Sequence, residues 1–524
     1  GGGLTGLTLA CALGELGVRA VLLDEDNTVG VKGASSRGIC YTQKSLEIFE
    51  RLGLYHRIAA KGVQWHVGRT FAGNDEVYHF DLSKNPGFKL SAQPPFVNIQ
   101  QFYIEGFLVE QIQALPSVQL RWSNRVTGLV QGDGLATLSI ATHAGEYRAR
   151  ARFIVDCTGA KTPFRNWLGV GVQTTKGDDR WCIADVRFKE RPPVERHTWI
   201  EAPFNEGRAV WQHLMADDVW RLDYQMTPDS DPEAVSQESV VRARINRQFG
   251  RDVDCDIVWV GPYAYRSECV ERMSYAAGQS TVFFAGDTAK LVSPFGARGG
   301  NTGISDADNL AWKLATVVQG YAAPQLLDSY HDERHEAAQV NVQVTNRTAR
   351  FLRPADGAER LFRTAAISLA RQYPFAQALV NTGRMAVANT YTRSRACGPG
   401  GGVSVPNVRL QWADGSAAEL VDLLYWADGR LLLLCFGQQP KGALARLRRL
   451  TQNAHLVAVQ VLRPGVHAQA CEAVTDPNGQ LQSACAAPHG GWALLRPDSY
   501  LGAAGAAIDA GVVRAIALSM GAAA

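Results

Sequence analysis

The sequence predicts an α/β protein in which a nucleotide-binding unit is interleaved with a strand-rich unit and followed by a small α/β tail. Three observations favour this fold. A glycine-rich turn at the N-terminus opens a helix that leads into a short apolar strand, and a second buried strand with a long helix lies near residue 290. The stretch Gly398-Pro399-Gly400-Gly401-Gly402 then separates a tail with its own pattern. The length of 524 residues allows two to four domains.

The composition argues against several classes of function. The net charge is +3, and no dense basic run points to nucleic acid or to an anionic membrane. No apolar stretch reaches the roughly 18 residues that a membrane span needs. The ten cysteines form no C-x-x-C pair, which argues against a zinc site or a redox pair. We therefore expect a cytoplasmic protein with no metal site, no nucleic-acid partner and no membrane span.

Local patterns assign the first part of the chain. Apolar residues recur at helical spacing over 4–16, and Gly17 ends this helix. Residues 18–24 form a short apolar run that ends in an acid, which suits a buried parallel strand. Amphipathic helices are expected over 43–53 and 103–115, and strands over 118–130 and 136–155.

The later patterns complete the domain plan. Strands are expected over 180–226, a helix over 233–249, a buried strand over 281–286, a helix over 301–319 and further helices over 325–393. In the tail we expect strands over 430–436, 455–462 and 492–496, and a basic helix over 440–453. The predicted domains are nucleotide-binding and helical parts over 1–175 and 270–395, a substrate-binding sheet over 176–269, and the tail over 403–524.

The N-terminal glycines carry the first chemical signal. Gly1-x-Gly3-x-x-Gly6 permits a tight turn and a close approach of backbone to a pyrophosphate at a helix N-terminus. Asp24 ends the next strand, where a ribose-binding carboxylate belongs. The alternatives are a glycine-rich loop and an ordinary strand-end acid. Because a glycine turn needs a strand to turn from, we also expect a strand of the nucleotide-binding sheet before Gly1.

The segment 283–312 carries the second signal. It contains Gly286-Asp287 and the loop Pro294-Phe295-Gly296-Ala297-Arg298-Gly299-Gly300-Asn301. This segment resembles the Gly-Asp motif and flavin loop of the FAD-dependent aromatic hydroxylases, the class A flavoprotein monooxygenases typified by p-hydroxybenzoate hydroxylase. It is most similar to the phenol, 3-(3-hydroxyphenyl)propionate and polyketide hydroxylases. The resemblance implies that Asp287 bonds the ribityl chain of FAD and that backbone amides around Gly299, Gly300 and Asn301 face the flavin.

The loop also makes physical sense for a flavin. Reduced flavin carries negative charge near N1 and C2=O, which backbone N–H groups, a helix N-terminus and Arg298 would stabilise. Pro294 and Arg298 are therefore candidates for the catalytic site. The alternative is a glycine-rich loop that caps a helix, with Arg298 in solvent.

Other segments resemble the family in order along the chain. Arg37 resembles the arginine that reaches the FAD phosphate or ribose, and Gln101 resembles the glutamine that contacts FAD, with Gln100 as an alternative register. The segment 155–165 resembles the Asp-Gly motif but has Thr158 where the family has Asp, which puts pyridine-nucleotide use in doubt. Lys290 likewise replaces a histidine.

The resemblance implies a Rossmann-like FAD domain and an activity. NADH or NADPH would reduce FAD, O2 would add at C4a to give a hydroperoxide, and one oxygen atom would pass to a small aromatic substrate. The tail resembles the family's thioredoxin-like domain through Leu494-Leu495-Arg496-Pro497-Asp498-Ser499-Tyr500. Without C-x-x-C this domain should be redox-inert and serve packing or homodimer contacts.

The substrate candidates lie in the strands over 180–226. Trp211 and His213 share one strand face, as do Trp220 and Tyr224. His213 or Tyr224 could take part in a proton relay that makes a phenolate, although either could simply pack in a sheet. Rival functions are a halogenase-like or oxidase activity and a catalytically silent flavin scaffold. The Trp-x-Trp-x-Ile-Pro signature of flavin halogenases is absent, and only Thr158 favours the scaffold.

Overall fold

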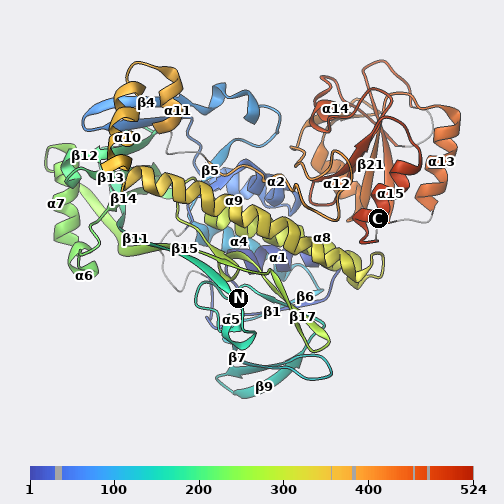
Figure 1. The fold of residues 1–524 in the computed structure, drawn as a ribbon, viewed down its shortest axis with the longest axis horizontal. Helices are drawn as coiled ribbons and strands as arrows, with labels where there is room; N and C mark the ends of the chain where they lie inside the picture. The colour runs from blue at the N-terminus through green and yellow to red at the C-terminus, as the bar shows by residue number, and fades with distance from the viewer. Residues whose placement is uncertain (30–37, 356, 381–384, 453–454, 469–471, 523–524) are drawn as a thin grey trace.

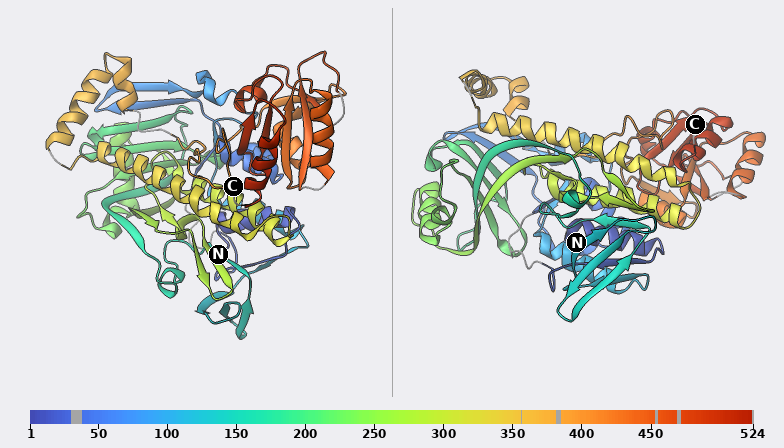
Figure 2. Two further views of the ribbon diagram at one scale, coloured as in Figure 1. Left: turned by 45° about the vertical axis from the view of Figure 1, so that its right-hand side comes forward. Right: turned by 60° about the horizontal axis from the view of Figure 1, so that its bottom comes forward.

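The computed structural model describes residues 1–29, 38–355, 357–380, 385–452, 455–468 and 472–522. Figure 1 shows a strand-rich part, an N-terminal unit and a C-terminal α/β unit, joined by two long helices, α8 (Arg298–Val318) and α9 (Asp328–Leu352). Both further views show α9 extending from the strand-rich part to the C-terminal unit (Figure 2). No helix in the described ranges is both long and apolar enough to cross a membrane.

The N-terminal unit is built around α1 (Leu4–Glu15), which packs against α4 (Gln101–Gln113) and α8. Strand β1 (Ala20–Leu23) pairs in parallel with β6 (Val118–Arg121). A second sheet has the order β10-β17-β16, with β10 parallel to β17. The predicted helix over 4–16 and the buried strand over 281–286 are therefore confirmed. The run over 18–24 does form a parallel strand, but this strand is not buried as predicted, since Val21 is 55% exposed. A strand before Gly1 stays a prediction. The remaining bounds are β10 (Phe153–Asp156), β16 (Ser274–Ala277), β17 (Ser280–Phe284), β2 (Cys40–Thr42), β5 (Phe96–Asn98), β7 (Arg125–Val130), β8 (Thr137–Thr142), β9 (Gly145–Arg150), α2 (Gln43–Arg51), α3 (Tyr55–Lys61) and α5 (Phe164–Trp167).

The strand-rich part is one eight-stranded sheet in the order β18-β15-β11-β14-β13-β12-β3-β4. Its strands are β3 (Val67–Ala72), β4 (Asp75–Asp81), β11 (Val172–Phe188), β12 (Arg196–Ala202), β13 (Arg208–Leu214), β14 (Trp220–Gln225), β15 (Cys255–Val270) and β18 (Lys290–Leu291). The sheet is thus not confined to 176–269, because β3 pairs in parallel with β12 and brings β4 with it.

The two faces of this sheet have different partners. On one face Leu222 and Tyr224 pack against Val241 and Ile245 of α7 (Glu238–Phe249). On the other face Trp211 packs in a separate aromatic cluster and lines a cavity. Strand alternation produces this division, because neighbouring residues point to opposite faces. The helices that complete this region are α6 (Pro232–Val235), α10 (Gly357–Ala370) and α11 (Pro374–Val380).

Several helix boundaries differ from the sequence prediction, and the helix expected over 233–249 is divided into α6 and α7. Helix α8 begins at Arg298 rather than near 301, because Ala297 adopts the left-handed conformation (φ 56°) and turns the chain directly into the helix. The helices predicted over 325–393 end at Val380, and residues 385–393 are not helical. Short 3₁₀ turns occur at η1 (Leu82–Lys84), η2 (Pro86–Phe88), η3 (Pro203–Asn205), η4 (Ala216–Asp218), η5 (Gly286–Thr288) and η6 (Pro324–Leu327).

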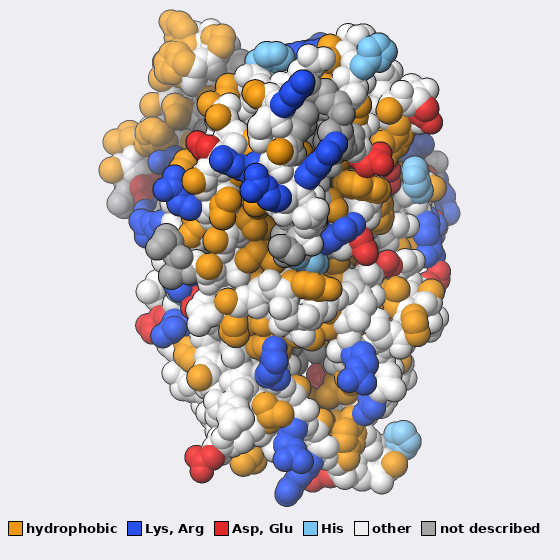
Figure 3. Space-filling view, turned by 90° about the vertical axis from the view of Figure 1, so that its right-hand side faces the viewer, with side chains coloured by type: hydrophobic (Ala, Val, Ile, Leu, Met, Phe, Trp, Pro, Cys, Tyr) orange, Lys and Arg blue, Asp and Glu red, His pale blue; other side chains and the backbone are white. Residues whose placement is uncertain are grey.

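The C-terminal unit is a seven-stranded sheet in the order β20-β19-β23-β22-β21-β24-β25. Its elements are β19 (Arg409–Trp412), β20 (Ala417–Glu419), α12 (Leu420–Ala427), β21 (Leu431–Phe436), α13 (Lys441–Gln452), β22 (Leu456–Leu462), β23 (Ala473–Thr475), α14 (Gln480–Ala484), β24 (Trp492–Leu495), β25 (Leu501–Gly505) and α15 (Ala510–Ser519). Strands β21 and β22 are buried along their whole length, as their unbroken apolar runs predict. The outward face on this side carries basic side chains interspersed with acidic and apolar ones (Figure 3).

A buried charge cluster joins the C-terminal unit to the rest of the chain. Arg496 donates to both carboxylate oxygens of Glu333 on α9, at 2.6 and 2.9 Å. Lys313 of α8 donates to the same Glu333 at 2.8 Å, and Lys44 of α2 donates to the carbonyl oxygen of Asp498 at 3.1 Å. The segment that resembles the tail of the hydroxylases is therefore one docking contact of this unit, beside those that Asn407 makes with Glu47 and Gln93.

Candidate functional site

A cavity of about 2320 Å³ lies where the N-terminal unit meets the eight-stranded sheet. The starts of α1 and α8 and the ends of β1 and β10 line one half of it. The inner face of the sheet lines the other half, and residues of the loop 292–301 also line the cavity. Two chemically different surfaces thus share one continuous space.

The N-terminal glycines form a turn that only glycine permits. A Cβ at Gly6 would lie 1.9 Å from the carbonyl oxygen of Gly1, and a Cβ at Gly1 would lie 2.4 Å from that of Cys157. Gly3 is different, because the nearest atom to its Cβ position is 3.9 Å away, at Glu105 Oε1. Gly1 and Gly6 therefore allow one backbone segment to approach another, and Gly3 leaves open space at the start of α1 for a ligand to approach.

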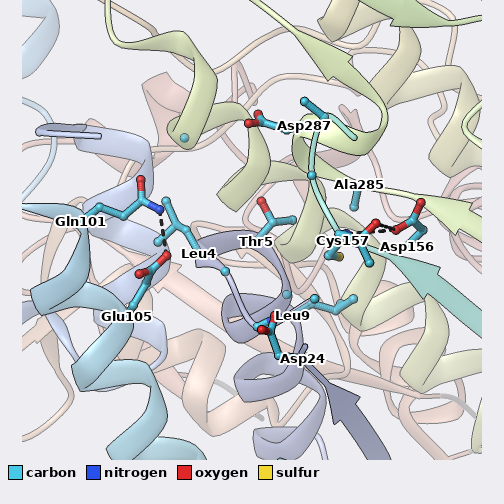
Figure 4. A pocket seen from close by; sticks show the side chains of 18 of the residues that line it. Leu4, Thr5, Leu9, Asp24, Gln101, Glu105, Asp156, Cys157, Ala285 and Asp287 are labelled. Atoms are coloured by element: carbon cyan, nitrogen blue, oxygen red, sulfur yellow. Dashed lines mark hydrogen bonds between the residues drawn. The ribbon is translucent and has the colours of Figure 1, made fainter. Parts of the chain in front are cut away.

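Asp24 lies beside this turn at the end of β1. Its carboxylate accepts a hydrogen bond from the backbone N–H of Gly2 and another, at 2.8 Å, from that of Asp26. Asp24 lines the cavity. In dinucleotide-binding folds an acid at this point binds the ribose hydroxyls. Figure 4 shows Asp24 below the start of α1, with Gln101 and Glu105 to one side.

Gln101, rather than Gln100, lines the cavity. Gln101 Oε1 accepts from the backbone N–H of Gly38 at 3.1 Å, and its Nε2 donates to Glu105 Oε1 at 2.8 Å. Gln100 Nε2 instead donates to the carbonyl oxygen of Ala216, toward the sheet. The prediction for Arg37 lies outside the described residues.

The turn η5 carries the second predicted motif. Gly286 has a φ of 67°, and a Cβ there would lie 2.5 Å from Thr5 Oγ1, so glycine lets this turn touch α1. The backbone N–H of Gly286 donates to Asp306 Oδ2 at 2.9 Å. Asp287 is exposed and lines the cavity on the opposite side of α1 from Asp24 (Figure 4).

Asp306 was not found by sequence reasoning, yet it holds this motif in place. Its fully buried carboxylate also pairs with Lys290 and accepts from Arg334 Nε at 2.7 Å. Burial would raise the pKa of Asp306, but the two cations lower that pKa below its ordinary value. Lys290 therefore anchors the carboxylate that orients Gly286. No sequence signal singled out Asp306, because Asp308 stands two residues further along the same helix.

The loop before α8 points the start of that helix into the cavity. Pro294, Gly299 and Gly300 line the cavity, and the first turn of this 21-residue helix leaves backbone N–H groups without helical acceptors. Such a helix end favours a negatively charged group. Arg298 also lines the cavity, and its Nη1 donates to Asn341 Oδ1 at 2.6 Å. Burial lowers the pKa of Arg298 below its ordinary value.

Asn301 ties this helix start to β2. Its Oδ1 accepts from the backbone N–H of Thr42 at 2.9 Å, and its Nδ2 donates to the carbonyl oxygens of Cys40 at 2.8 Å and Ala297 at 2.6 Å. The side-chain amide is thus committed to protein partners. Asn301 positions the loop, and a contact to cofactor would come from its backbone.

Thr158 occupies the place of the family's Asp. Its hydroxyl and its backbone N–H both donate to Asp156 Oδ1, at 2.7 and 3.0 Å. Thr162 donates to the other oxygen of the same carboxylate. Thr158 therefore closes a local turn beside the cavity. Burial raises the pKa of the neighbouring Cys157 thiol to about 12, which leaves that thiol protonated.

The sheet half of the cavity contains His213 but not Tyr224. Trp211, His213, Arg221 and Asp223 line it. The register pairs His213 with Arg221 across β13 and β14. Tyr224 lies on the opposite face, where its hydroxyl donates to Gln248 Oε1 at 2.7 Å. The structure therefore gives no support to the predicted relay through Tyr224, because strand alternation points this side chain away from the cavity.

The described residues of the first half fit a flavin dinucleotide. An open Gly3, a carboxylate at Asp24 and two helix N-termini face one cavity, and these are the features that a pyrophosphate, a ribose and an anionic ring need. No group of three metal-ligating side chains occurs among the residues described.

Comparisons with known proteins agree with this geometry. A 3-(3-hydroxy-phenyl)propionate/3-hydroxycinnamic acid hydroxylase of Mycolicibacterium gilvum (strain PYR-GCK) is 26% identical over 375 residues, which cover 71% of this chain and 63% of that protein. The chain thus spans less than two thirds of that relative. A protein of the same name from Burkholderia cenocepacia (strain HI2424) is 27% identical over 438 residues, which cover 81% of this chain and 76% of that protein.

A solved structure shares the whole fold. The flavin-dependent monooxygenase PieE, in complex with FAD and substrate, aligns over 99% of this chain and 98% of its own, with a TM-score of 0.82 at 22% identity. The family model described as "FAD binding domain" matches residues 1–345, which is more than half of the chain. With the glycine turn, Asp24 and the start of α8 at one cavity, this chain belongs to the FAD binding domain family.

Proposed function

We propose that this chain is an FAD-dependent monooxygenase that hydroxylates a phenolic or related aromatic substrate with O2 and NADH or NADPH. The observation that carries the proposal is the single cavity, whose one half fits FAD and whose other half is an aromatic sheet face. The two hydroxylase relatives act, by their names, on phenolic acids, and this supports the same class of reaction.

The cofactor would supply the chemistry, and the chain would supply binding and electrostatics. When bound, FAD would supply the redox and oxygen-transfer chemistry. Gly3 and Asp24 would hold the dinucleotide end, and Asp287 would bind the ribityl chain. The start of α8, with Arg298, would stabilise negative charge on the ring.

The sheet face would hold the substrate in a dry, aromatic environment. Trp181 and Trp211 stack with ring centroids 4.7 Å apart, and Phe295 meets Trp211 edge-on at 5.2 Å. Of these three, Trp211 lines the cavity, and Trp181 and Phe295 pack behind it, where Phe295 directly follows Pro294 of the flavin loop. Such a wall orients a flat ring and keeps water from the reacting atoms.

For the C-terminal unit we propose a thioredoxin-like domain without redox activity. The order β22-β21-β24-β25, with β21 parallel to β22 and antiparallel to β24, supports such a core, and α13 connects the parallel pair. Its role is to brace α8 and α9 and, in a homodimer, to supply contacts. The described cysteines are free, which supports a reducing, cytoplasmic location.

Flavin binding and substrate-stimulated turnover test the proposal in order. Purified protein should show flavin absorbance or acquire it with FAD. Phenolic compounds should then stimulate NADH or NADPH oxidation and yield a hydroxylated product. Protein that never acquires flavin would overturn the proposal at the cofactor. If no aromatic compound stimulates NADH or NADPH oxidation by the flavin-loaded protein, a silent scaffold is favoured. If stimulated oxidation yields only H2O2, an oxidase is favoured, and a halogenated product would favour a halogenase.

A further inference from the structure

Arg196 is a buried cation with no ionic partner among the described residues. It begins β12, is 6% exposed and lines the sheet half of the cavity. Its Nε has no hydrogen-bond partner there, and its Nη1 reaches only the sulfur of Met385, at 3.9 Å. Buried guanidinium groups are normally paired with anions, because desolvating an unpaired charge is costly. A negative partner is therefore missing at this point of the wall.

The neighbouring strands do not supply that partner. The register that pairs His197 with Gln212 places Arg196 opposite His213, and His213 pairs with Arg221 on the next strand. Asp223 is engaged by Arg221 Nε at 2.9 Å. Burial lowers the pKa of Arg196 below its ordinary value. Arg196, His213 and Arg221 thus lie side by side on three strands. The one carboxylate beside them, that of Asp223, is bound by Arg221.

His213 adds an open hydrogen-bonding atom to this row. Its Nδ1 is buried without a partner in the described structure, and its Nε2 lies 3.9 Å from Asp223 Oδ2, too far for a hydrogen bond. Burial, then Arg196 and Arg221, hold the pKa of His213 well below its ordinary value. A neutral imidazole between two cations is a poor base, but its Nδ1–H tautomer can donate a hydrogen bond to an anion.

We propose that Arg196 and His213 form a subsite for an ionised oxygen of the aromatic substrate, either a carboxylate or a phenolate. This inference rests on the proposed function and specifies its substrate class. The subsite opens into the space of the flavin half, because Arg196 and His213 line the same cavity as Cys40, whose carbonyl oxygen accepts a hydrogen bond from Asn301 at the start of α8. An anion held there fixes the ring beside the flavin loop, and Arg196 favours the ionised form of a phenol.

Binding measured through the flavin spectrum tests the subsite without requiring turnover. The FAD-loaded protein is titrated with 3-(3-hydroxyphenyl)propionate, with its methyl ester, and with phenols of graded acidity that lack a carboxylate. A charge-assisted contact to Arg196 corresponds to about 10- to 100-fold in affinity. If the acid binds at least about tenfold more tightly than its ester, the anion is a carboxylate. If affinity instead follows the ionised fraction of the phenols, it is a phenolate.

Variants test whether Arg196 causes the difference in affinity between ionised and neutral ligands. Arg196→Gln should remove the discrimination, Arg196→Lys should retain part of it, and neither should change the Kd for FAD. Arg187→Gln, at an exposed position of β11 in the same sheet, is the matched control and should leave all affinities unchanged. Wild-type protein that binds neutral and ionised ligands equally would overturn the subsite even if every variant failed to fold. An Arg196→Gln variant that loses FAD affinity instead would show that Arg196 serves the flavin.

The same experiments separate a failure of the proposed function from a failure of the subsite. Protein that takes up no FAD contradicts the proposed function, whereas FAD-loaded protein that turns over neutral phenols as readily as ionised ones contradicts only the subsite.

Discussion

Arg496 and Glu333 form a two-pronged ion pair, at 2.6 and 2.9 Å, in which neither side chain has exposed surface. Arg496 belongs to the C-terminal unit and Glu333 to α9, so the pair links units that are far apart in sequence. Asp306, which holds the Gly286 turn, is bound by Arg334, the next residue along α9. The docking contact and the support of the flavin motif therefore share one helix.

Glu333→Gln should destabilise the protein strongly. It leaves Arg496 and Lys313 buried without their anion, for which the expected loss is about 3–5 kcal/mol in the free energy of unfolding. Asp217→Asn, which weakens the exposed Lys61–Asp217 pair, should cost less than about 1 kcal/mol. Urea unfolding of both variants measures the difference, and equal losses would contradict the role of the buried cluster.

Acid should weaken the same contact. Burial would raise the pKa of Glu333, but Arg496 and Lys313 hold that pKa well below its ordinary value of 4.5. A carboxylate with a lowered folded-state pKa contributes stability above its unfolded pKa and loses it as pH falls further. The parent should therefore lose stability below about pH 4.5, and Glu333→Gln should lose less over the same range. If the parent and Glu333→Gln lost the same stability as pH falls, the pKa of Glu333 would not be the cause.

Gly3→Ala should impair FAD binding without disturbing the fold. The added methyl meets no protein atom closer than 3.9 Å, yet it fills the space where the dinucleotide approaches α1. We expect at least about a tenfold rise in the Kd for FAD, the size of one lost close contact. Gly106→Ala on α4 is the matched control, since nothing lies within 4 Å of its Cβ position. Fluorescence titration with FAD compares them, and an unchanged Kd for Gly3→Ala would contradict the assignment.

Tyr224→Phe should leave turnover nearly unchanged. The hydroxyl contacts Gln248 behind the sheet, so its loss should cost about 1 kcal/mol of stability and alter kcat by less than about twofold. Steady-state kinetics and thermal unfolding together check both statements. A tenfold fall in kcat with an unchanged Tm would place Tyr224 in the mechanism after all.

His213 should make the fold sensitive to mild acid. Its folded-state pKa lies well below the ordinary 6.5, so the unfolded chain binds the proton more readily, and stability is lost as pH falls below that value. At pH 5 the loss approaches about 2 kcal/mol, from 1.36 kcal/mol per pH unit. His213→Gln should lose correspondingly less between pH 7 and pH 5, as urea midpoints would show. Equal losses in the parent and the variant would mean that His213 is not held neutral.

Local chemistry explains what the sequence could predict. The glycines around Gly6 and the apolar run that ends at Asp24 specify a turn, a helix and a strand through short-range geometry alone. The unbroken apolar runs of β21 and β22 likewise predict two buried strands. The motifs at Asp287 and Gly300 could be found because each is a short contiguous segment.

Long-range partners explain what the sequence could not predict. Strand alternation groups Trp211 with His213, but it does not say which face meets the cofactor half, and Tyr224 was misplaced for that reason. The role of Asp306 depends on Arg334, 28 residues along the chain. The unpaired state of Arg196 emerges only when three strands lie side by side. Sheet register and buried pairing are global properties that no local pattern fixes.

The central claim is that one cavity brings FAD and an aromatic ring together for oxygen transfer. Its most direct test is product mass after turnover of the FAD-loaded protein with NADPH or NADH and a phenolic acid under ¹⁸O2. The account predicts a hydroxylated product that carries one ¹⁸O atom and forms in step with the reduced nicotinamide consumed. Reduced nicotinamide that is consumed without any ¹⁸O entering the aromatic compound would contradict it.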